Sequence, residues 1–437
     1  MTLSSRDFPT DQHGWSELLP ARQACRSIKG TVRVPWVVVG AGLTGLACSR
    51  RLAELHPNNE ILLLDARLVG QGASGRNSGF TVGVSHFPGV FKAHEKANFA
   101  RVNRINQAGL SILDQQINTL AIDCHWDSSG FHHGAADIAS VKEQKNFIDY
   151  LNAMEIEHSS LDQQAMQSRF GTTLYQAGVH VRPGGLVQPA ALVRGLADGL
   201  PSNVKLVENC PVLKVQSGDS IKLQLAKGEV IADNLVMATN YEAPKLGFLR
   251  RRLIGSTLSG SFTRVLTEQE LASLGSHKSW GIISLHGGGA TLRLTQDGRI
   301  CLRNTAEYSG AALLSSAALK SRQAIHRSSF EKRFPQLAHV PFEHAWSGVE
   351  GISGNGTNFF GQQGKNIYLA GGYNGSGVSR GTAFGQTLAD YASGGQSELI
   401  TDCLSSATAT WLPPRPFLDI GAMFKISARF RGVGLDR

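Results

Sequence analysis

Short apolar runs that alternate with helical patterns organise the first part of the chain. Residues 36–39 are continuously apolar, and after a glycine-rich turn apolar positions recur at helical spacing over residues 46–55. A second apolar run, residues 61–64, follows a short turn and ends at Asp65. Strands that are buried on both faces are apolar throughout, and helices join them when they are parallel. The pattern therefore predicts a strand–helix–strand unit over residues 36–65.

The turn after the first predicted strand has the spacing of a nucleotide-binding loop. It reads Gly-X-Gly-X-X-Gly at Gly40, Gly42 and Gly45, and Asp65 follows about 20 residues later. Gly40 permits the tight turn, Gly42 leaves room for a pyrophosphate, and Gly45 lets the helix pack closely on the strand. The acidic residue is expected to bind a ribose. Dinucleotide binding is the prediction, and a glycine-rich turn in an ordinary parallel sheet is the alternative.

Two further glycine-rich segments favour FAD over a nicotinamide dinucleotide. Residues 72–79 read GASGRNSG, which could wrap a ligand with amides and hydroxyls, although a flexible surface loop is the alternative. Residues 371–377 lie between a predicted strand at 366–370 and a helical pattern. The start of that helix would stabilise the negative charge of a reduced flavin, with a coincidental strand-to-helix turn as the alternative. A nicotinamide cofactor has no need of a second, distant glycine-rich loop.

The middle of the chain predicts a helix followed by a meander of short strands. Pro189 stands where the first position of a helix is expected, and apolar residues continue at helical spacing to Leu196. Alternating apolar and polar positions then predict short strands that return to the central sheet. These strands are predicted at Val204–Val207, Val212–Val215, Ile221–Leu225, Gly228–Ile231 and Leu235–Ala238.

Composition limits the class of protein. The chain has 437 residues, 41% hydrophobic and 18% charged, which excludes disorder for most of it. No apolar run approaches a membrane span, and the first 35 residues lack the apolar core of a secretory signal. Six scattered cysteines, without a CxxC pair or a Cys/His cluster, favour reduced thiols, no metal site and a cytoplasmic location. The net charge of +9 is not gathered into one segment, so no nucleic-acid partner is expected.

Several segments together resemble one family. The glycine loop at 40–45, the GASGRNSG segment and the segment at 372–381 are similar to those of the D-amino acid oxidase superfamily of FAD-dependent oxidoreductases, which includes glycine oxidase and sarcosine oxidase. Residues 73–77 and the proline-rich 413–416 most resemble the gamma-glutamylputrescine oxidase type. The resemblance extends from about residue 10 to the end. Further markers are Gly184–Pro189, Met237–Tyr241 and Leu294–Arg299.

The resemblance implies an α/β fold with two discontinuous domains. One is an FAD-binding, Rossmann-like domain entered through the strand–helix–strand unit, and the other is an inserted substrate domain built on a mixed or antiparallel sheet. The expected division is an N-terminal arm at 1–35, FAD-binding segments at 36–112, 186–244 and 345–395, substrate-domain segments at 113–185 and 245–344, and a C-terminal tail at 396–437.

The resemblance also assigns residues to the cofactor. Members that tether the flavin use a cysteine in the segment matching residues 346–351, where this chain has none, so non-covalent FAD is expected. A backbone group near Val212 is expected to face the adenine, although a core strand there is an equal alternative. The residues expected to contact FAD are Gly40, Gly42, Gly45, Asp65, Ala66, Arg67, Gly72, Ala73, Ser74, Arg76, Asn77, Ser78, Val212, Thr239, Asn240, Gly372, Gly375, Ser376 and Gly377.

The resemblance implies oxidation of a small-molecule amine to an imine, by hydride transfer to flavin N5. Amino-acid-oxidising members hold the substrate carboxylate with an arginine where this chain has Glu350, and Trp346 lies in the same segment. A carboxylate there would repel an α-amino acid and attract an ammonium group. The alternatives are a surface or ion-paired Glu350, and an amino-acid substrate held by Arg293 or Arg303. Aromatic candidates for the substrate pocket are Phe80, His86, Trp126, Phe131, Tyr308 and Trp346.

Oxygen or a quinone-type acceptor is expected to reoxidise the flavin. Sarcosine-oxidase-like members place a lysine near flavin N5, but residues 280–299 contain none. His286 or Arg293 would supply positive charge there, although a lone histidine is commonly structural. An acceptor-linked dehydrogenase is therefore an alternative to an oxidase. A flavin-binding protein without turnover is the third hypothesis.

The end of the chain predicts an amphipathic helix. From residue 417 onward Met423, Ile426 and Phe430 recur at helical spacing, with Lys425 and Arg429 beside them. Packing of this helix on the FAD-binding domain is the expected arrangement. Contact with a membrane surface, without a membrane span, is the alternative.

Overall fold

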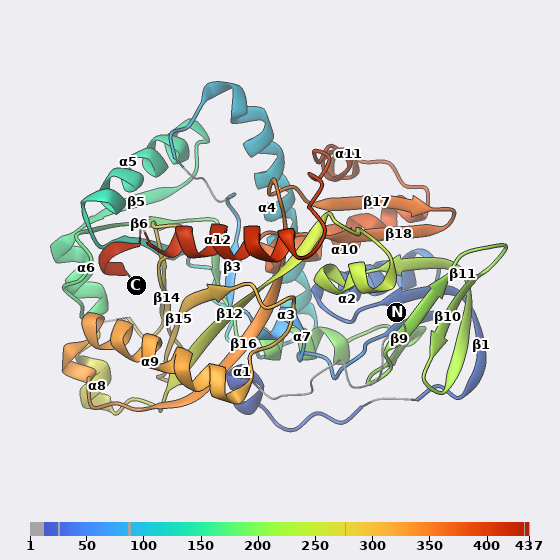
Figure 1. The fold of residues 1–437 in the computed structure, drawn as a ribbon, viewed down its shortest axis with the longest axis horizontal. Helices are drawn as coiled ribbons and strands as arrows, with labels where there is room; N and C mark the ends of the chain where they lie inside the picture. Colours follow the sequence, from blue (N-terminus) through green and yellow to red (C-terminus); the bar gives the residue numbers. More distant parts are fainter. Residues whose placement is uncertain (1–12, 25–26, 86–88, 276, 432, 437) are drawn as a thin grey trace.

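The computed structural model describes residues 13–436 except 25–26, 86–88, 276 and 432. These residues form two eight-stranded sheets and one two-stranded sheet (Figure 1). In the first sheet β18, β11, β1, β2 and β8 run parallel, β17 pairs antiparallel with β18, and β10 and β9 continue antiparallel from β11. The strands are β1 (Gly30–Val39), β2 (Ile61–Leu64), β8 (Val204–Val207), β9 (Val212–Gln216), β10 (Ile221–Leu225), β11 (Gly228–Met237), β17 (Phe359–Gly364) and β18 (Ile367–Gly371).

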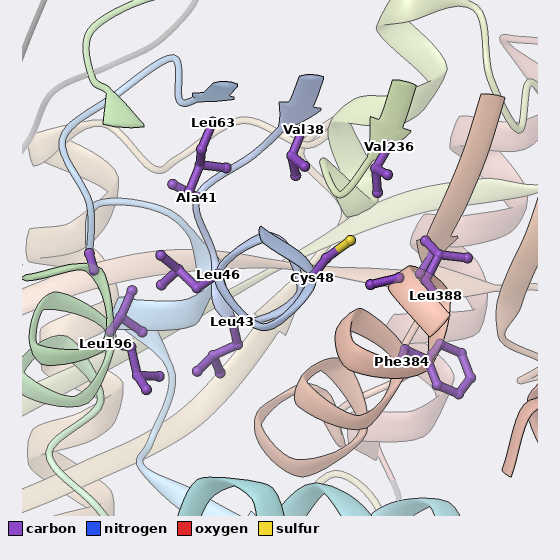
Figure 2. Packing of buried hydrophobic residues seen from close by; sticks show 14 of the residues in the cluster. Val38, Ala41, Leu43, Leu46, Cys48, Leu63, Leu196, Val236, Phe384 and Leu388 are labelled. Atoms are coloured by element: carbon purple, nitrogen blue, oxygen red, sulfur yellow. The ribbon is translucent and has the colours of Figure 1, made fainter. Parts of the chain in front are cut away.

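The parallel strands of the first sheet are apolar because helices and loops cover both faces. Val38 of β1 lies opposite Val236 of β11 and Leu63 of β2 in the strand register. Figure 2 shows these three side chains directed toward helix α2, from which Leu46 and Cys48 enter the same buried cluster. The predicted strand–helix–strand unit therefore owes its packing to apolar contacts between α2 and three neighbouring strands.

Helices that cover this face approach one another at backbone distance. A Cβ on Gly385 of α10 would lie 2.1 Å from the carbonyl oxygen of Thr44 in α2. A Cβ on Gly109 of α4 would likewise lie 1.9 Å from the carbonyl oxygen of Ser379 in α10. Glycine at each crossing therefore sets how closely the helices pack. The helices of this domain are α2 (Leu43–Leu55), α4 (Lys96–Thr119), α7 (Pro189–Asp198), α10 (Gly377–Ala392) and α11 (Glu398–Leu404).

The second sheet has the order β16-β12-β15-β14-β13-β4-β6-β5 and is mixed, as expected for the substrate domain. Its neighbouring strands are antiparallel except β13 and β4. Its strands are β4 (Phe131–Ala135), β5 (His158–Asp162), β6 (Ala177–Val181), β12 (Leu253–Thr263), β13 (Trp280–Ser284), β14 (Thr291–Leu294), β15 (Ile300–Glu307) and β16 (Phe342–Ser353).

The remaining described elements connect or cover the sheets. The small sheet pairs β3 (Phe80–Val82) with β7 (Gly184–Leu186). The other helices are α1 (Gly14–Glu17), α3 (Ala73–Arg76), α5 (Ile138–Ala153), α6 (Gln163–Phe170), α8 (Glu268–Ala272), α9 (Ser316–Arg333) and α12 (Phe417–Arg431), with short 3₁₀ turns η2 (Ala93–Glu95), η3 (Asn240–Leu246), η4 (Pro335–Leu337) and η5 (Gly434–Asp436).

Several expected boundaries fall inside elements. The first strand begins at Gly30 rather than at residue 36, and β11 is one continuous strand where two were predicted. The boundary expected between 112 and 113 lies within α4. The boundary expected at 345 lies within β16, which remains in the second sheet as far as Ser353. Tertiary pairing extends each of these elements beyond the residues that carry its sequence pattern.

The tail helix does not have the expected environment. Helix α12 packs mainly against β15 of the second sheet, whereas packing on the FAD-binding domain was expected. Ile426 and Phe430 face a cavity, as helical spacing suggested, whereas Met423 is on the exposed side of the helix. The expectation that all three share one packed face is therefore wrong. Among the described residues no helix is both long and apolar enough to span a bilayer.

We expect Gly385→Ala to destabilise the protein, because the added methyl group would meet the α2 backbone at 2.1 Å. Overpacking of this kind typically costs about 1–3 kcal/mol. The measurement is the urea unfolding midpoint of the FAD-loaded protein. Gly421→Ala is the control, because a Cβ at that helical glycine meets nothing within 4 Å. Equal midpoints for both variants would contradict the close crossing.

Candidate active site

A cavity of about 1120 Å³ lies at the carboxyl ends of the parallel strands, where the first sheet meets the second. The loops that follow β1, β2, β11 and β18 form one side of it, and β12, β15 and β16 contribute to the other. The volume exceeds that of typical small-ligand pockets, about 300–1,000 Å³. Ligands of open α/β sheets bind at this edge, so the cavity is the candidate active site.

The glycine loop after β1 has the close contacts that its spacing predicts. Gly40 has a φ of +104°, and a Cβ there would lie 2.6 Å from the carbonyl oxygen of Ala238. A Cβ on Gly42 would lie 2.7 Å from the hydroxyl oxygen of Ser74, and one on Gly45 would lie 1.7 Å from the carbonyl oxygen of Gly40. The backbone from Gly40 to the start of α2 therefore forms the cavity wall itself.

Asp65, at the end of β2, is tied to two backbone amides. Its carboxylate accepts hydrogen bonds from the amide of Ala41 at 2.7 Å and from that of Arg67 at 2.8 Å. Burial raises the pKa of Asp65, while these hydrogen bonds act in the opposite direction and favour the carboxylate. A carboxylate has about four lone-pair sites, so acceptor capacity is left for a ligand hydroxyl.

The GASGRNSG segment is folded, which excludes the flexible-loop alternative. The hydroxyl oxygen of Ser74 in α3 accepts a hydrogen bond from the amide of Leu43 at 3.1 Å. The buried guanidinium of Arg76 donates to the carbonyl of Ser347 at 3.0 Å, and the Asn77 side chain donates to the carbonyl of Ser74 at 2.7 Å. Arg76 and Asn77 line the cavity, and both side chains donate hydrogen bonds to backbone carbonyls of the protein. Ser74 therefore holds the segment against the start of α2, and Arg76 holds it against β16.

The loop between β18 and α10 lines another part of the cavity. Gly375, Ser376 and Gly377 face it, and α10 begins at Gly377. The hydroxyl groups of Tyr373 and Thr44 share a hydrogen bond of 2.6 Å, which joins this loop to the start of α2. Both helix N-termini therefore present amides and positive dipole ends to the same cavity.

All the residues expected to contact FAD line the cavity except two. Gly45 lies beneath the loop, where it permits contact between α2 and the strand end. Gly372 has a φ of +70° and donates its amide hydrogen to the side-chain oxygen of Asn240 at 2.9 Å. A Cβ on Gly372 would lie 2.6 Å from the ring of Phe359. Gly372 therefore has a structural place beside the cavity, and its contact with FAD stays a prediction.

The residues present fit an FAD molecule. The cavity extends from Asp65 and Val212 to Trp346, and glycines line it where a Cβ would intrude. The Thr239 hydroxyl is buried and has no partner among the described residues, as expected of a group that meets a ligand. We propose that the adenosine half lies by Asp65 and Val212, the pyrophosphate by the glycine loop, and the flavin by Gly375.

Strand β16 brings the expected substrate residues together. Trp346 and Glu350 are an even number of positions apart, so their side chains project to the same face, and both line the cavity together with Gly348 between them. The Trp346 indole donates to the carbonyl of Arg76 at 3.1 Å, and its ring packs edge-on against Trp15 of the N-terminal arm. A Glu350 carboxylate oxygen lies 3.7 Å from the position of a Cβ on Gly375. Glu350 therefore faces the loop assigned to the flavin.

Of the three positively charged candidates, His286 and Arg303 line the cavity and Arg293 does not. His286, in the turn after β13, lines the cavity, and its buried Nδ1 has no partner among the described residues. Arg303 of β15 also lines it and donates to the hydroxyl of Thr291. Arg293 lies behind the wall, where it donates to the carbonyl of Val187 and faces the Trp15 ring. Burial lowers the pKa of Arg293 to about 10. Arg293 does not line the cavity, so it is poorly placed to clamp a substrate carboxylate.

The cysteines along the cavity are poor nucleophiles. Cys210 and Cys301 line it, and burial raises their pKa values to about 11 and about 12 respectively. A thiol forms a covalent bond through its thiolate, which is scarce at such pKa values. Non-covalent FAD is therefore still our prediction, although thiols do reach the cavity wall.

Some of the aromatic candidates line the cavity, and others lie outside it. Phe80 and Phe131 line the cavity with Trp346 and meet each other edge-on at 5.5 Å. Trp126 lies outside it, where its indole donates to Asp114 at 2.9 Å, and the hydroxyl of Tyr308 accepts from Arg415 instead. His86 is outside the described residues. Trp126 and Tyr308 as pocket residues are therefore wrong expectations.

Sequence reasoning missed part of the wall. Tyr373 follows two glycines and Lys245 belongs to a 3₁₀ turn, so neither stood out by type or spacing. Helix α12 also contributes Leu418, Ala422 and Ile426. Apolar residues at helical spacing indicated a packed face. The spacing did not indicate which part of the protein that face would meet. No group of three or more potential metal-ligating side chains occurs in the described part of the chain.

Comparison with known proteins agrees with this geometry. Residues 35–391 match the family described as DAO, FAD dependent oxidoreductase. The chain is 27% identical over 364 residues to gamma-glutamylputrescine oxidoreductase of Escherichia coli, covering 82% of this chain and 83% of that protein. It is 26% identical over 385 residues to a probable oxidoreductase, OrdL, of Haemophilus influenzae, covering 83% of each.

The fold agrees with that of solved relatives. Glycine oxidase from Geobacillus kaustophilus superposes with a TM-score of 0.70 at 16% identity, over 84% of this chain and 96% of that one. The chain belongs to the DAO family of FAD-dependent oxidoreductases. Its cofactor is FAD, and the predictions of family, fold class and flavin-dependent oxidoreductase activity are confirmed.

Gly42→Val should lower FAD retention, because its side chain would enter the space assigned to the pyrophosphate and press on Ser74. Crowding of this kind typically costs about 1–3 kcal/mol, so we expect the affinity to be about 5- to 140-fold weaker. The measurement is FAD binding to the deflavinated protein by fluorescence quenching. Gly218→Val in the β9–β10 turn is the control, since its Cβ meets only one atom within 4 Å, at 3.9 Å. Equal affinities would place the pyrophosphate elsewhere.

Proposed function

We propose that the protein oxidises a primary or secondary amine to an imine, which water hydrolyses. One observation carries the choice of an amine: Glu350, a carboxylate, faces the loop assigned to the flavin from the cavity wall. When bound, FAD supplies the centre that accepts a hydride equivalent from the carbon bearing the nitrogen. The amine nitrogen gives up a proton in the same overall change.

The protein's own groups bind and orient the substrate. A carboxylate at Glu350 attracts an ammonium group and repels the carboxylate of an α-amino acid. Trp346, Phe80 and Phe131 give this end of the cavity apolar walls, which restrict the orientation of the substrate and exclude water. The E. coli relative, which by its name is an oxidoreductase of gamma-glutamylputrescine, is consistent with an amine.

An amino-acid substrate is the second candidate. Arg303 lines the same cavity and would supply the guanidinium that a substrate carboxylate requires. The solved glycine oxidase shares the fold, and its name describes an amino-acid substrate. The two candidates differ in which charged group meets the substrate, so a direct comparison of substrates distinguishes them.

The acceptor and the location of the protein are further parts of the proposal. We propose oxygen or a quinone-type acceptor, with His286 as the cavity-lining group that supplies positive charge when protonated. The described cysteines, Cys48, Cys124, Cys210, Cys301 and Cys403, are free thiols, which supports a cytoplasmic location.

We expect amines or polyamines to bleach the visible flavin absorbance of the purified FAD-loaded protein in the absence of oxygen. The reason is that electrons from the substrate collect on the flavin when no acceptor is present. Glycine, proline and other amino acids are the comparison set. Bleaching by amino acids alone would favour Arg303 and the second candidate. Bleaching by none would favour a flavin-binding protein without turnover.

Glu350→Gln should raise KM for the amine by about 10-fold or more, because a charge-assisted hydrogen bond contributes about 1.5–3 kcal/mol. Steady-state kinetics and anaerobic flavin reduction at several amine concentrations measure it. Glu343→Gln is the matched control on the same strand, since Glu343 is exposed and ion-paired with Arg299 outside the cavity. If both variants kept the original KM, the role proposed for Glu350 would be wrong.

A further inference from the structure

Helix α12 has one face in the cavity and another in solvent. It crosses the front of the molecule in Figure 1, where it is drawn in red. Leu418, Ala422 and Ile426 face the cavity, with a spacing of one helical turn. The helix is thus a wall between the candidate active site and the surface.

The outer face of α12 is apolar, which is unusual for an exposed helix. Phe417, Ile420, Met423 and Phe424 are 67%, 64%, 58% and 67% exposed, and of these four Phe417 also borders the cavity. Their spacing of three and four residues makes them neighbours on the helix surface. A helix of a soluble protein normally turns charged and polar residues to water, so clustered exposed apolar side chains mark an interaction surface. We call these four residues the outer α12 face.

Both ends of α12 are anchored, so the outer face is held in place. After the helix, the buried side chain of Asp436 forms an ion pair with buried Arg333, which also donates to the Asp436 carbonyl at 2.8 Å. Before the helix, Arg415 donates to the hydroxyl of Tyr308 at 3.2 Å. A loosely attached tail would lack such contacts. The outer α12 face is therefore a surface of the folded protein.

Positive charge accompanies the apolar face. Residues 411–431 contain four basic residues and one acidic residue, Asp419, which is ion-paired with Arg415 at 3.1 Å. Lys425 is exposed on the helix and also borders the cavity. Just before the helix, Trp411 is exposed beneath the guanidinium of Arg251, 5.8 Å from the ring centre. Apolar side chains with cations and an interfacial tryptophan beside them are typical of helices that lie in a membrane interface.

We propose that the outer α12 face docks on the surface of an anionic lipid bilayer. The apolar side chains would enter the headgroup region while Arg415, Lys425 and Arg251 meet lipid phosphates. A second copy of the chain is a poorer occupant, because a two-fold contact would bring the same basic residues of both copies together. Docking would set the helix-lined end of the cavity against the bilayer. The proposal does not depend on the identity of the substrate.

The test is flotation of the FAD-loaded protein with vesicles of equal parts phosphatidylglycerol and phosphatidylcholine. We expect binding to these vesicles, at least tenfold weaker binding to phosphatidylcholine alone, and weakening by salt. The double variant Ile420→Ser/Phe424→Ser should lose binding at least tenfold, because neither side chain lines the cavity and both lie in the outer face. Val265→Ser, an exposed apolar residue near α8, should bind as the unchanged protein does.

The flavin content of each variant shows whether it keeps the fold. Because the replaced side chains are exposed, we expect the flavin content to be unchanged. Absence of flotation by the unchanged protein would overturn the proposal, as would equal flotation of the double variant or equal binding to neutral vesicles. Sedimentation without lipid gives a further check. A dimer that the double variant abolishes would assign the outer α12 face to a second copy and also overturn the proposal.

Discussion

Close approach of backbone to backbone is the constraint on which the rest of this structure depends. The loop after β1 and the loop before α10 border one cavity because α2 and α10 cross at Gly385, where a Cβ would strike the carbonyl of Thr44. The hydrogen bond between Thr44 and Tyr373 then joins the two loops directly. A side chain at this crossing would separate the two helix N-termini. The backbone amides at the two helix N-termini would then no longer face the same ligand. The FAD site would lose one of its two sets of amide donors.

The second sheet converts a nucleotide site into a candidate active site. Strand β16 carries Trp346 and Glu350 into the cavity, while the buried Arg76 ties that strand to the GASGRNSG segment. The cofactor wall and the substrate wall are therefore hydrogen-bonded to each other. The N-terminal arm adds Trp15, which packs on the far side of the Trp346 ring. Positions of substrate residues relative to the flavin thus rest on contacts between segments far apart in the chain.

Two arginines that look equivalent in the sequence have different environments in the structure. Arg293 and Arg303 lie on neighbouring strands, yet Arg293 is buried behind the wall and Arg303 reaches the cavity. The register pairs Arg293 with Cys301 and Arg303 with Thr291, so both arginines project to the same face of the sheet. Distant segments decide the difference, because Val187 and Trp15 cover Arg293. No local pattern distinguishes the two. The same reasoning applies to α12, whose apolar residues divide between a face in the cavity and a face in solvent.

The sequence by itself determined the nucleotide-binding unit, because Gly40, Gly42, Gly45 and Asp65 act through backbone geometry that short spacings dictate. It also identified FAD and the family, since the glycine segments are local motifs. Only the tertiary structure decided that Gly372 is structural, that Arg293 is enclosed, and that α12 lines the cavity. Those outcomes depend on which distant segments meet. The hydrophobic pattern of a chain indicates which face of an element is buried. Which other segment covers that face depends on packing across the whole fold.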